Sequence, residues 1–178
     1  MARRRTIALL AGLVLLSGLS VAGGAMIDAP PTLTAENDDN TTYRVTAYTV
    51  ENRETALLMN FAVTTEDGDR RLATLSQLVW PEGFRNVTVV DDGVPTQQIT
   101  VEPDDEVTTT IDGWTPGNVT VYVAKDVDDN GTHVLTDINT CPARQQEHSI
   151  TFDEGGSSWS STCSSSIDWL FPRSNQPI

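Results

Sequence analysis

Four oxygen-bearing side chains near residue 130 are spaced like the ligands of a calcium loop. Asp126, Asp128 and Asn130 lie at alternate positions, Gly131 follows them, and Asp137 lies eleven residues after Asp126. In a 12-residue calcium loop, oxygen ligands occupy positions 1, 3, 5 and 12, and a glycine at position 6 allows the sharp turn. Calcium is therefore the one cofactor that the sequence suggests.

A plain β-hairpin explains the same residues without a metal ion. Asn-Gly is the dipeptide that best supports a two-residue hairpin turn, and a turn at Asn130 and Gly131 would place Val127 opposite Val134. The neighbouring aspartates would then be solvent-exposed carboxylates. The stretch also departs from the calcium pattern, because Asp137 stands where a bidentate glutamate is usual. Both interpretations stay open here, and the hairpin is favoured.

Cys141 and Cys163 are the only cysteines, and in an exported chain they are expected to form a disulfide. Closing that loop would contribute about 3 kcal/mol of stability by restricting the unfolded chain. The functional alternative is a metal site that combines the two cysteines with His133 and His148. No methionine follows His148 as a blue-copper centre would require, and no ligand pair has zinc-site spacing.

Four Asn-X-Thr sequons are candidate sites for N-linked glycans, and they begin at Asn40, Asn86, Asn118 and Asn130. Asn86 and Asn118 alternate with valines in predicted strands, so their side chains are expected to point to solvent. A glycan on Asn130 would compete with metal binding by the same side chain. We expect glycosylation at some of these positions.

The motifs of common enzymes are missing from the sequence. It contains no nucleophile elbow, no HExxH pair and no phosphate-binding loop. The serines of residues 157–166 form a low-complexity run that is typical of a linker. Among 25 carboxylates some pair will lie at glycosidase separation by chance, so spacing selects no catalytic pair. The sequence therefore predicts no catalytic residue, and a secreted hydrolase is the least favoured function.

Alternating apolar and polar residues predict that β-strands carry these candidate residues. Short alternating segments separated by turn residues are typical of an antiparallel sandwich or barrel. The clearest segments are 43–48, 57–64, 87–89, 99–101, 107–111, 119–123 and 132–138. Residues 70–80 fit a helix and a strand equally well. The predicted fold class is all-β.

Residues 99–124, with the sequence ITVEPDDEVTTTIDGWTPGNVTVYVA, carry a more specific similarity. They resemble the second half of immunoglobulin-like domains of prokaryotic surface proteins, such as the cell-adhesion-related domain of bacteria and archaea. Pro116 and Gly117 occupy the turn that precedes the alternating valine strand of those domains. The resemblance implies an immunoglobulin-like, or fibronectin-III-like, antiparallel β-sandwich that acts as a binding or spacing module.

The charge balance excludes nucleic acid and anionic lipid surfaces as partners. The chain has 25 acidic and 11 basic residues and a net charge of -14, and Lys125 is its single lysine. Nucleic acids and anionic membranes are bound through clusters of Lys and Arg. Such an acid excess resembles that of exported haloarchaeal proteins, because at molar salt the screening length falls to about 3 Å and the repulsion between carboxylates largely disappears.

Residues 1–25 are predicted to be a signal peptide or a membrane anchor. Three arginines at positions 3–5 precede an uncharged run over residues 6–27, which is long enough to span a bilayer as a helix. The small residues at 22–25 offer a cleavage site, and the arginines fit export by the Sec or the Tat route. The protein would contact the membrane only through residues 6–27, and only if these are not removed.

The remaining chain divides into three predicted parts. Residues 26–41 are expected to be a flexible spacer, 42–154 a β-sandwich, and 155–178 a Ser-rich tail tethered by the disulfide. The predicted function is a non-catalytic, extracellular or cell-envelope interaction module of a halophilic archaeon. Its expected partners are other cell-envelope proteins or glycans, and its oligomeric state is left open. The alternative is a structural subunit of a surface filament or a virion.

Overall fold

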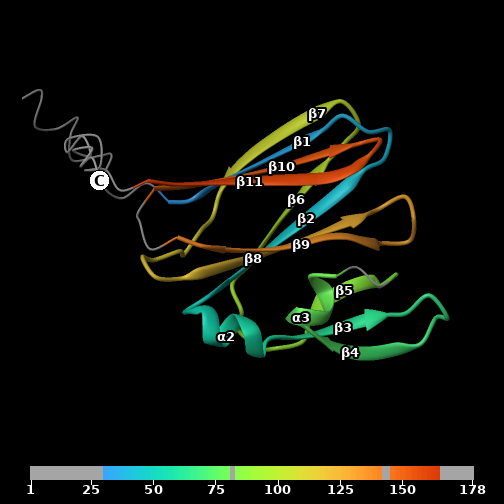
Figure 1. The fold of residues 1–178 in the computed structure, drawn as a ribbon, viewed down its shortest axis with the longest axis horizontal. Helices are drawn as coiled ribbons and strands as arrows, with labels where there is room; N and C mark the ends of the chain where they lie inside the picture. The colour runs from blue at the N-terminus through green and yellow to red at the C-terminus, as the bar shows by residue number, and fades with distance from the viewer. Residues whose placement is uncertain (1–29, 81–82, 142–144, 165–178) are drawn as a thin grey trace, which may run out of the picture.

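The computed structural model describes residues 30–80, 83–141 and 145–164 (Figure 1). Nearly all of their regular structure is β-strand. The elements are β1 (Thr32–Asn37), β2 (Tyr43–Val50), α2 (Arg53–Leu58), β3 (Asn60–Thr64), β4 (Arg70–Thr74), α3 (Leu75–Leu78), β5 (Arg85–Val89), β6 (Thr96–Val101), β7 (Asp105–Thr110), β8 (Val119–Asp126), β9 (Thr132–Thr140), β10 (Gln145–Asp153) and β11 (Gly156–Ser164).

The strands form two hydrogen-bonded sheets. In space they lie in three levels, because the larger sheet is nearly interrupted between β5 and β9. One sheet has the order β11-β10-β1-β7, and the other has the order β4-β3-β5-β9-β8-β2-β6. In the second sheet β5 meets β9 through one residue pair, Arg85 with Thr132, so β3, β4 and β5 form a separate level below β8 and β9 (Figure 1). The described residues are all-β with mostly antiparallel sheets, consistent with the predicted sandwich. The predicted N-terminal helix lies outside them.

Strand β8 is buried on both faces. Val119, Val121 and Val123 point into a hydrophobic core shared with β3 and the two helices. Tyr122 and Ala124 point the other way, into a second core shared with β1 and β10. The alternation predicted the strand correctly. The prediction that its second face points to solvent was wrong, because the four-stranded sheet covers that face.

The predicted spacer contains a strand of the sandwich. Within residues 26–41, β1 lies between β7 and β10 and pairs with both along its whole length, antiparallel to β7 and parallel to β10. Leu33 and Ala35 are buried in the second core. The six residues TLTAEN carry little apolar signal of their own, and their partners on both sides supply the backbone hydrogen bonds.

The predicted Ser-rich tail also begins with a strand. Within residues 155–178, β11 pairs with β10 from Gly156 to Ser164. Hydrogen bonding to the neighbouring backbone holds this polar edge strand in place, so it needs no hydrophobic periodicity. The rest of the predicted tail, residues 165–178, lies outside the described residues.

Two shorter predictions also differ from the structure. Leu57, which was expected in a strand, lies on α2, whose first turn is capped by Asn52 accepting a hydrogen bond from the Thr55 N–H at 2.9 Å. The open segment 70–80 contains both a strand and a helix, β4 and then α3. Local capping therefore overrides the strand pattern at the start of the predicted segment 57–64.

The β8–β9 turn was predicted correctly in conformation but not in register. Asn130 and Gly131 have φ values of 52° and 73°, the left-handed conformation that Asn-Gly turns require. Val127, however, leaves the ladder and donates its N–H to the carbonyl of Thr42 at 2.9 Å. It therefore does not lie opposite Val134.

Candidate functional site

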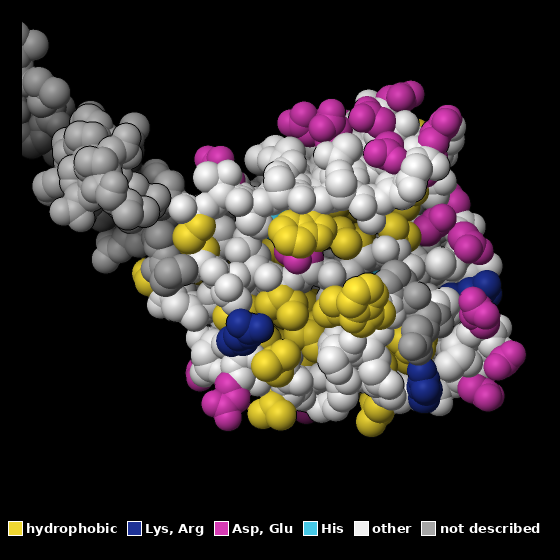
Figure 2. All heavy atoms as spheres, viewed as in Figure 1, with side chains coloured by type: hydrophobic (Ala, Val, Ile, Leu, Met, Phe, Trp, Pro, Cys, Tyr) yellow, Lys and Arg dark blue, Asp and Glu magenta, His cyan; other side chains and the backbone are white. Residues whose placement is uncertain are grey.

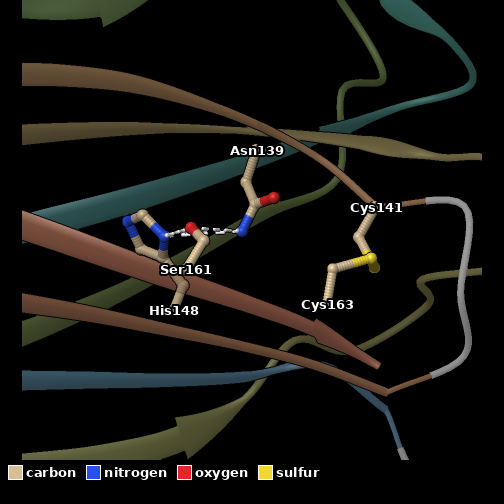
Figure 3. The surroundings of a disulfide bond; sticks show 5 residues. All are labelled: Asn139, Cys141, His148, Ser161 and Cys163. Carbon is tan, nitrogen blue, oxygen red and sulfur yellow. Dashed lines mark hydrogen bonds between the residues drawn. A yellow bond between two sulfur atoms is a disulfide. The ribbon is translucent and has the colours of Figure 1, made fainter. Parts of the chain in front are cut away.

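A group of polar side chains lies between the two sheets next to the disulfide (Figure 3). Asp137 and Asn139 come from β9, His148 from β10, Ser161 from β11 and Tyr122 from β8; we call this group the polar seam. His148 is 1% exposed, and Asp137 and Asn139 are also buried. The seam connects the two sheets through side chains, because β9 and β10 belong to different sheets.

Hydrogen bonds order the seam around the imidazole of His148. Ser161 Oγ lies 2.7 Å from His148 Nδ1 and accepts a hydrogen bond from Asn139 Nδ2 at 2.9 Å. On the other side of the ring, His148 Nε2 lies 3.7 Å from Asp137 Oδ2. The ring also stacks on Tyr122 with centroids 4.1 Å apart. A hydroxyl, an imidazole and a carboxylate therefore lie in sequence, which is the set of groups that can activate a nucleophile.

The electrostatics of the seam do not suit general-base catalysis near neutral pH. Burial lowers the pKa of His148 to about 4 and raises the pKa of Asp137. An efficient general base has a pKa near the working pH. A pKa this far below the working pH makes His148 a weak base, and its ring contacts side chains of β9 and β11 as well as Tyr122 of β8.

Cys141 and Cys163 form a disulfide, which confirms the predicted pairing. Cys141 follows β9 and Cys163 lies on β11, so the bond joins one sheet to the other at the end of the seam (Figure 3). The metal alternative is not realised. His133 lies opposite Lys125 in the β8–β9 ladder, hydrogen-bonded to Thr136 at 2.7 Å and away from His148.

The four predicted calcium ligands do not converge. Asp126 Oδ1 accepts a hydrogen bond from the Asp129 N–H, and Asp128 Oδ2 accepts one from the Thr42 N–H, both at 2.8 Å. Asp137 lies five residues beyond Thr132 on β9, about 16 Å further along a strand that stays extended despite a register shift at Val134. No three His, Cys, Asp or Glu side chains of the described ranges are grouped so that they could hold a metal ion.

The sequon asparagines differ in their surroundings. Asn40, Asn86 and Asn130 are exposed, whereas Asn118 is half-buried and its Oδ1 accepts a hydrogen bond from Thr115 Oγ1 at 2.8 Å. Glycosylation at the four positions stays a prediction, and the first three are the more accessible.

A second feature, which the sequence analysis missed, is a set of exposed apolar side chains on the level of β3, β4, β5 and the helices. We call it the apolar surface; its members are Leu57, Leu58, Leu72, Val79, Trp80 and Val90. Trp80 is 76% exposed, Leu58 71% and Leu72 65%. In Figure 2 apolar side chains lie on the middle and lower part of the face, and most of the acidic side chains lie at its upper and right margins. Exposure depends on the final packing, so the local sequence gave no signal for it.

Two packed sheets joined by the polar seam and a disulfide define a β-sandwich domain without a recognisable catalytic centre in its described part. The family model of the Halobacterial Ig domain protein matches residues 1–172, so the chain belongs to this family. This match confirms the sequence-based identification of a haloarchaeal protein with an immunoglobulin-like domain. Such domains are typically non-catalytic.

Comparisons with individual proteins add little. A comparison with curated proteins gave no match. Among solved structures, the chain is similar to the lipoprotein TssJ1 of the Pseudomonas aeruginosa T6SS, at a TM-score of 0.39 and 12% identity, covering 77% of this chain and 98% of that one. It is also similar to a structure described as "Trapped Toxin", at a TM-score of 0.33 and 9% identity, covering 75% and 23%. The membrane-binding domain of pneumolysin gives a TM-score of 0.30 and 8% identity, covering 76% and 97%.

These similarities are too low for a functional argument, and the chain spans only 23% of the "Trapped Toxin" chain. The described residues also contain no helix that is long and apolar enough to cross a membrane. Residues 6–27, the predicted anchor or signal peptide, lie outside the described ranges.

Proposed function

We propose that this protein is an exported, non-catalytic interaction module of the haloarchaeal cell envelope that binds another envelope protein through its apolar surface. Residues 1–25 direct the export and are either cleaved or kept as an anchor. Membership of the Halobacterial Ig domain family supports an interaction role. The low basicity of the buried His148 imidazole argues against general-base hydrolysis at the polar seam.

The exposure of Trp80, Leu58 and Leu72 is the observation that carries the proposal. Each loses the stabilisation that burial would give, roughly 1.5–3 kcal/mol for a large apolar side chain. Exposed apolar side chains that adjoin one another mark interaction sites in soluble proteins, and the proposal takes these three side chains as parts of one such site. Molar salt increases the tendency of apolar surface to be buried, so the patch is expected to be covered in the cell.

The test compares the wild type with two variants. One replaces two members of the apolar surface, and the control replaces an exposed tryptophan outside it. The tagged full chain is expressed in a haloarchaeal host, cross-linked in whole cells and analysed by mass in about 2 M KCl. The wild type is expected to form one discrete complex, which the double variant Leu58→Ser, Trp80→Ser loses. Trp159→Ser is the control, because Trp159 is 52% exposed and lies on β11.

Three outcomes are informative. Loss of the complex in the double variant alone supports the proposal. A complex that persists in the double variant contradicts it. A ladder of copies of this chain, lost in the same variant, contradicts a separate partner and supports the filament or virion subunit.

A further inference from the structure

We propose that Arg44 and Lys125 form a binding pocket for an acidic saccharide, a sugar whose carboxylate lies between the two cationic side chains. This pocket is separate from the apolar surface and lies where β2, β5 and the β8–β9 turn meet. It has a volume of about 350 Å³ and is lined by Arg44, Asn86, Lys125, Val127, Asn130 and Gly131.

The two cations lie side by side because the sheet register places them there. Arg44 on β2 is the direct cross-strand partner of Lys125 on β8. The Lys125 ammonium reaches the next level and donates a hydrogen bond to the carbonyl of Val87 on β5 at 2.9 Å. Like charges directly opposite each other in a sheet are destabilising. The arrangement therefore has a cost that the sheet alone does not explain.

This acidic protein has many carboxylates that could pair with Arg44 and Lys125, yet none of the described ones does so. Of the chain's 25 carboxylates, none forms an ion pair with Arg44 or Lys125 in the described ranges. Arg44 Nε is buried and finds no hydrogen-bond partner there. Burial and the neighbouring guanidinium both lower the pKa of Lys125. A ligand carboxylate would supply the missing counter-charge, and a guanidinium can bind both of its oxygens.

The other lining groups favour a sugar over a simple ion. Asn86 and Asn130 are exposed at the pocket, and in a chain that carries no glycan at these two positions their side-chain amides can donate to and accept from hydroxyl groups. Asn86 also approaches the turn closely, since a Cβ on Gly131 would lie 2.9 Å from Asn86 Oδ1. The backbone N–H of Asn86 donates to the carbonyl of Gly131 at 2.9 Å, which fixes the two rims of the pocket relative to each other.

Molar salt sets a requirement on such a site. With a screening length of about 3 Å, long-range attraction to the two cations is lost and chloride competes for them. Recognition must then come from several directed hydrogen bonds at contact distance. A sugar carboxylate can bind a guanidinium through both oxygens and its adjacent hydroxyls can also donate, whereas chloride is a single spherical acceptor. We therefore expect weak binding that survives in high salt and distinguishes a uronate from a neutral sugar.

The test measures thermal melting of the full chain in about 2 M KCl with sodium glucuronate, and with glucose or acetate at equal concentration and ionic strength. At tenfold excess over Kd, glucuronate is expected to raise the wild-type Tm by about 3 °C, whereas glucose and acetate give no saturable shift. Arg44→Gln and Lys125→Gln are each expected to abolish the shift. Arg53→Gln on α2, which removes the same charge outside the pocket, is expected to keep it.

Two results would overturn the inference. One is a glucuronate shift no larger than that of acetate, which would make the pocket a non-specific anion site. The other is a glucuronate shift that remains in Lys125→Gln, the variant that removes a single hydrogen bond and is the more certain to fold. Saturation-transfer NMR on glucuronate gives a second readout that does not depend on the stability of the variants.

Discussion

At the scale of single residues, His148 makes the stability of the fold depend on pH. Burial lowers its pKa from 6.5 to about 4, so between these values the unfolded chain binds a proton that the folded chain does not. The free energy of unfolding therefore falls as the pH drops from about 6.5 to 4, by up to about 3 kcal/mol. His133, with a pKa also lowered to about 4, acts in the same direction.

The measurement compares Tm at pH 7 and pH 4.5 in high salt for the wild type and His148→Gln. We expect a smaller loss of Tm in the variant, because glutamine does not titrate. Asp137 has a raised pKa and so the opposite sign, since its protonation favours the folded state as the pH falls. Asp137 lies 3.7 Å from His148, so its contribution changes somewhat with the substitution, but an identical loss of Tm in both chains would show that His148 is not the cause.

Gly131 and Gly113 form a matched pair for testing the β8–β9 turn. Both have positive φ, 73° and 71°, but only at Gly131 would a Cβ meet a neighbour, Asn86 Oδ1 at 2.9 Å. Gly113→Ala is expected to cost about 1 kcal/mol from backbone conformation alone. Gly131→Ala should cost measurably more in chemical denaturation, and equal costs would mean that the contact relaxes freely.

The sequence predicted some of the contacts between these residues and missed others, and the difference has a physical reason. The disulfide between Cys141 and Cys163 followed from composition, because an exported chain with two cysteines has one possible intramolecular pairing. The contact between His148 and Ser161 depends on the register of β10 with β11, which a run of serines does not encode. The calcium ligands failed for a similar reason, since Asp137 fits the spacing only if the chain curls where it is in fact extended.

At the scale of elements, substitutions in β1 test whether this part of the predicted spacer is a packed strand. Leu33 is buried in the second core, whereas Thr34 on the opposite face is half-buried and hydrogen-bonds to Thr108 at 3.0 Å. Leu33→Ala is expected to cost about 2–5 kcal/mol and Thr34→Ala less than about 1 kcal/mol in the free energy of unfolding. A flexible spacer would leave both variants equal to the wild type, and that result would contradict the structure.

The elements that the sequence located well, β2, β8 and β9, have a strong apolar alternation, whereas β1 and β10 also contribute to the second core but were not located. β2, β8 and β9 alternate because their residues pack on both sides of the middle level. β1 and β11 were missed because their stability comes from partner strands, whose identity is a property of the tertiary fold. Helix α2 was missed because its cap at Asn52 competed with the strand pattern of Leu57 to Val63.

At the scale of the whole molecule, the acid excess predicts how stability depends on salt. Residues 26–178 contain 25 acidic and 8 basic side chains, a net charge of -17. Acidic side chains lie close together at the upper and right margins of Figure 2, where repulsion is strongest in dilute buffer. Screening at molar ionic strength removes most of this repulsion, so Tm should rise with salt and level off near about 1 M.

A variant separates repulsion from the general effect of salt on apolar surface. Asp104→Asn, Asp105→Asn and Glu106→Gln replace three adjacent exposed carboxylates at the start of β7. If repulsion dominates, this variant should melt about 2–4 °C above the wild type at low salt, the effect of about 1 kcal/mol, and the two curves should converge above about 1 M. If the salt acts mainly by strengthening apolar burial, the two chains should gain Tm in parallel at every concentration. Parallel curves would mean that the carboxylates serve hydration and solubility, and that the stability of the sandwich comes from its two cores.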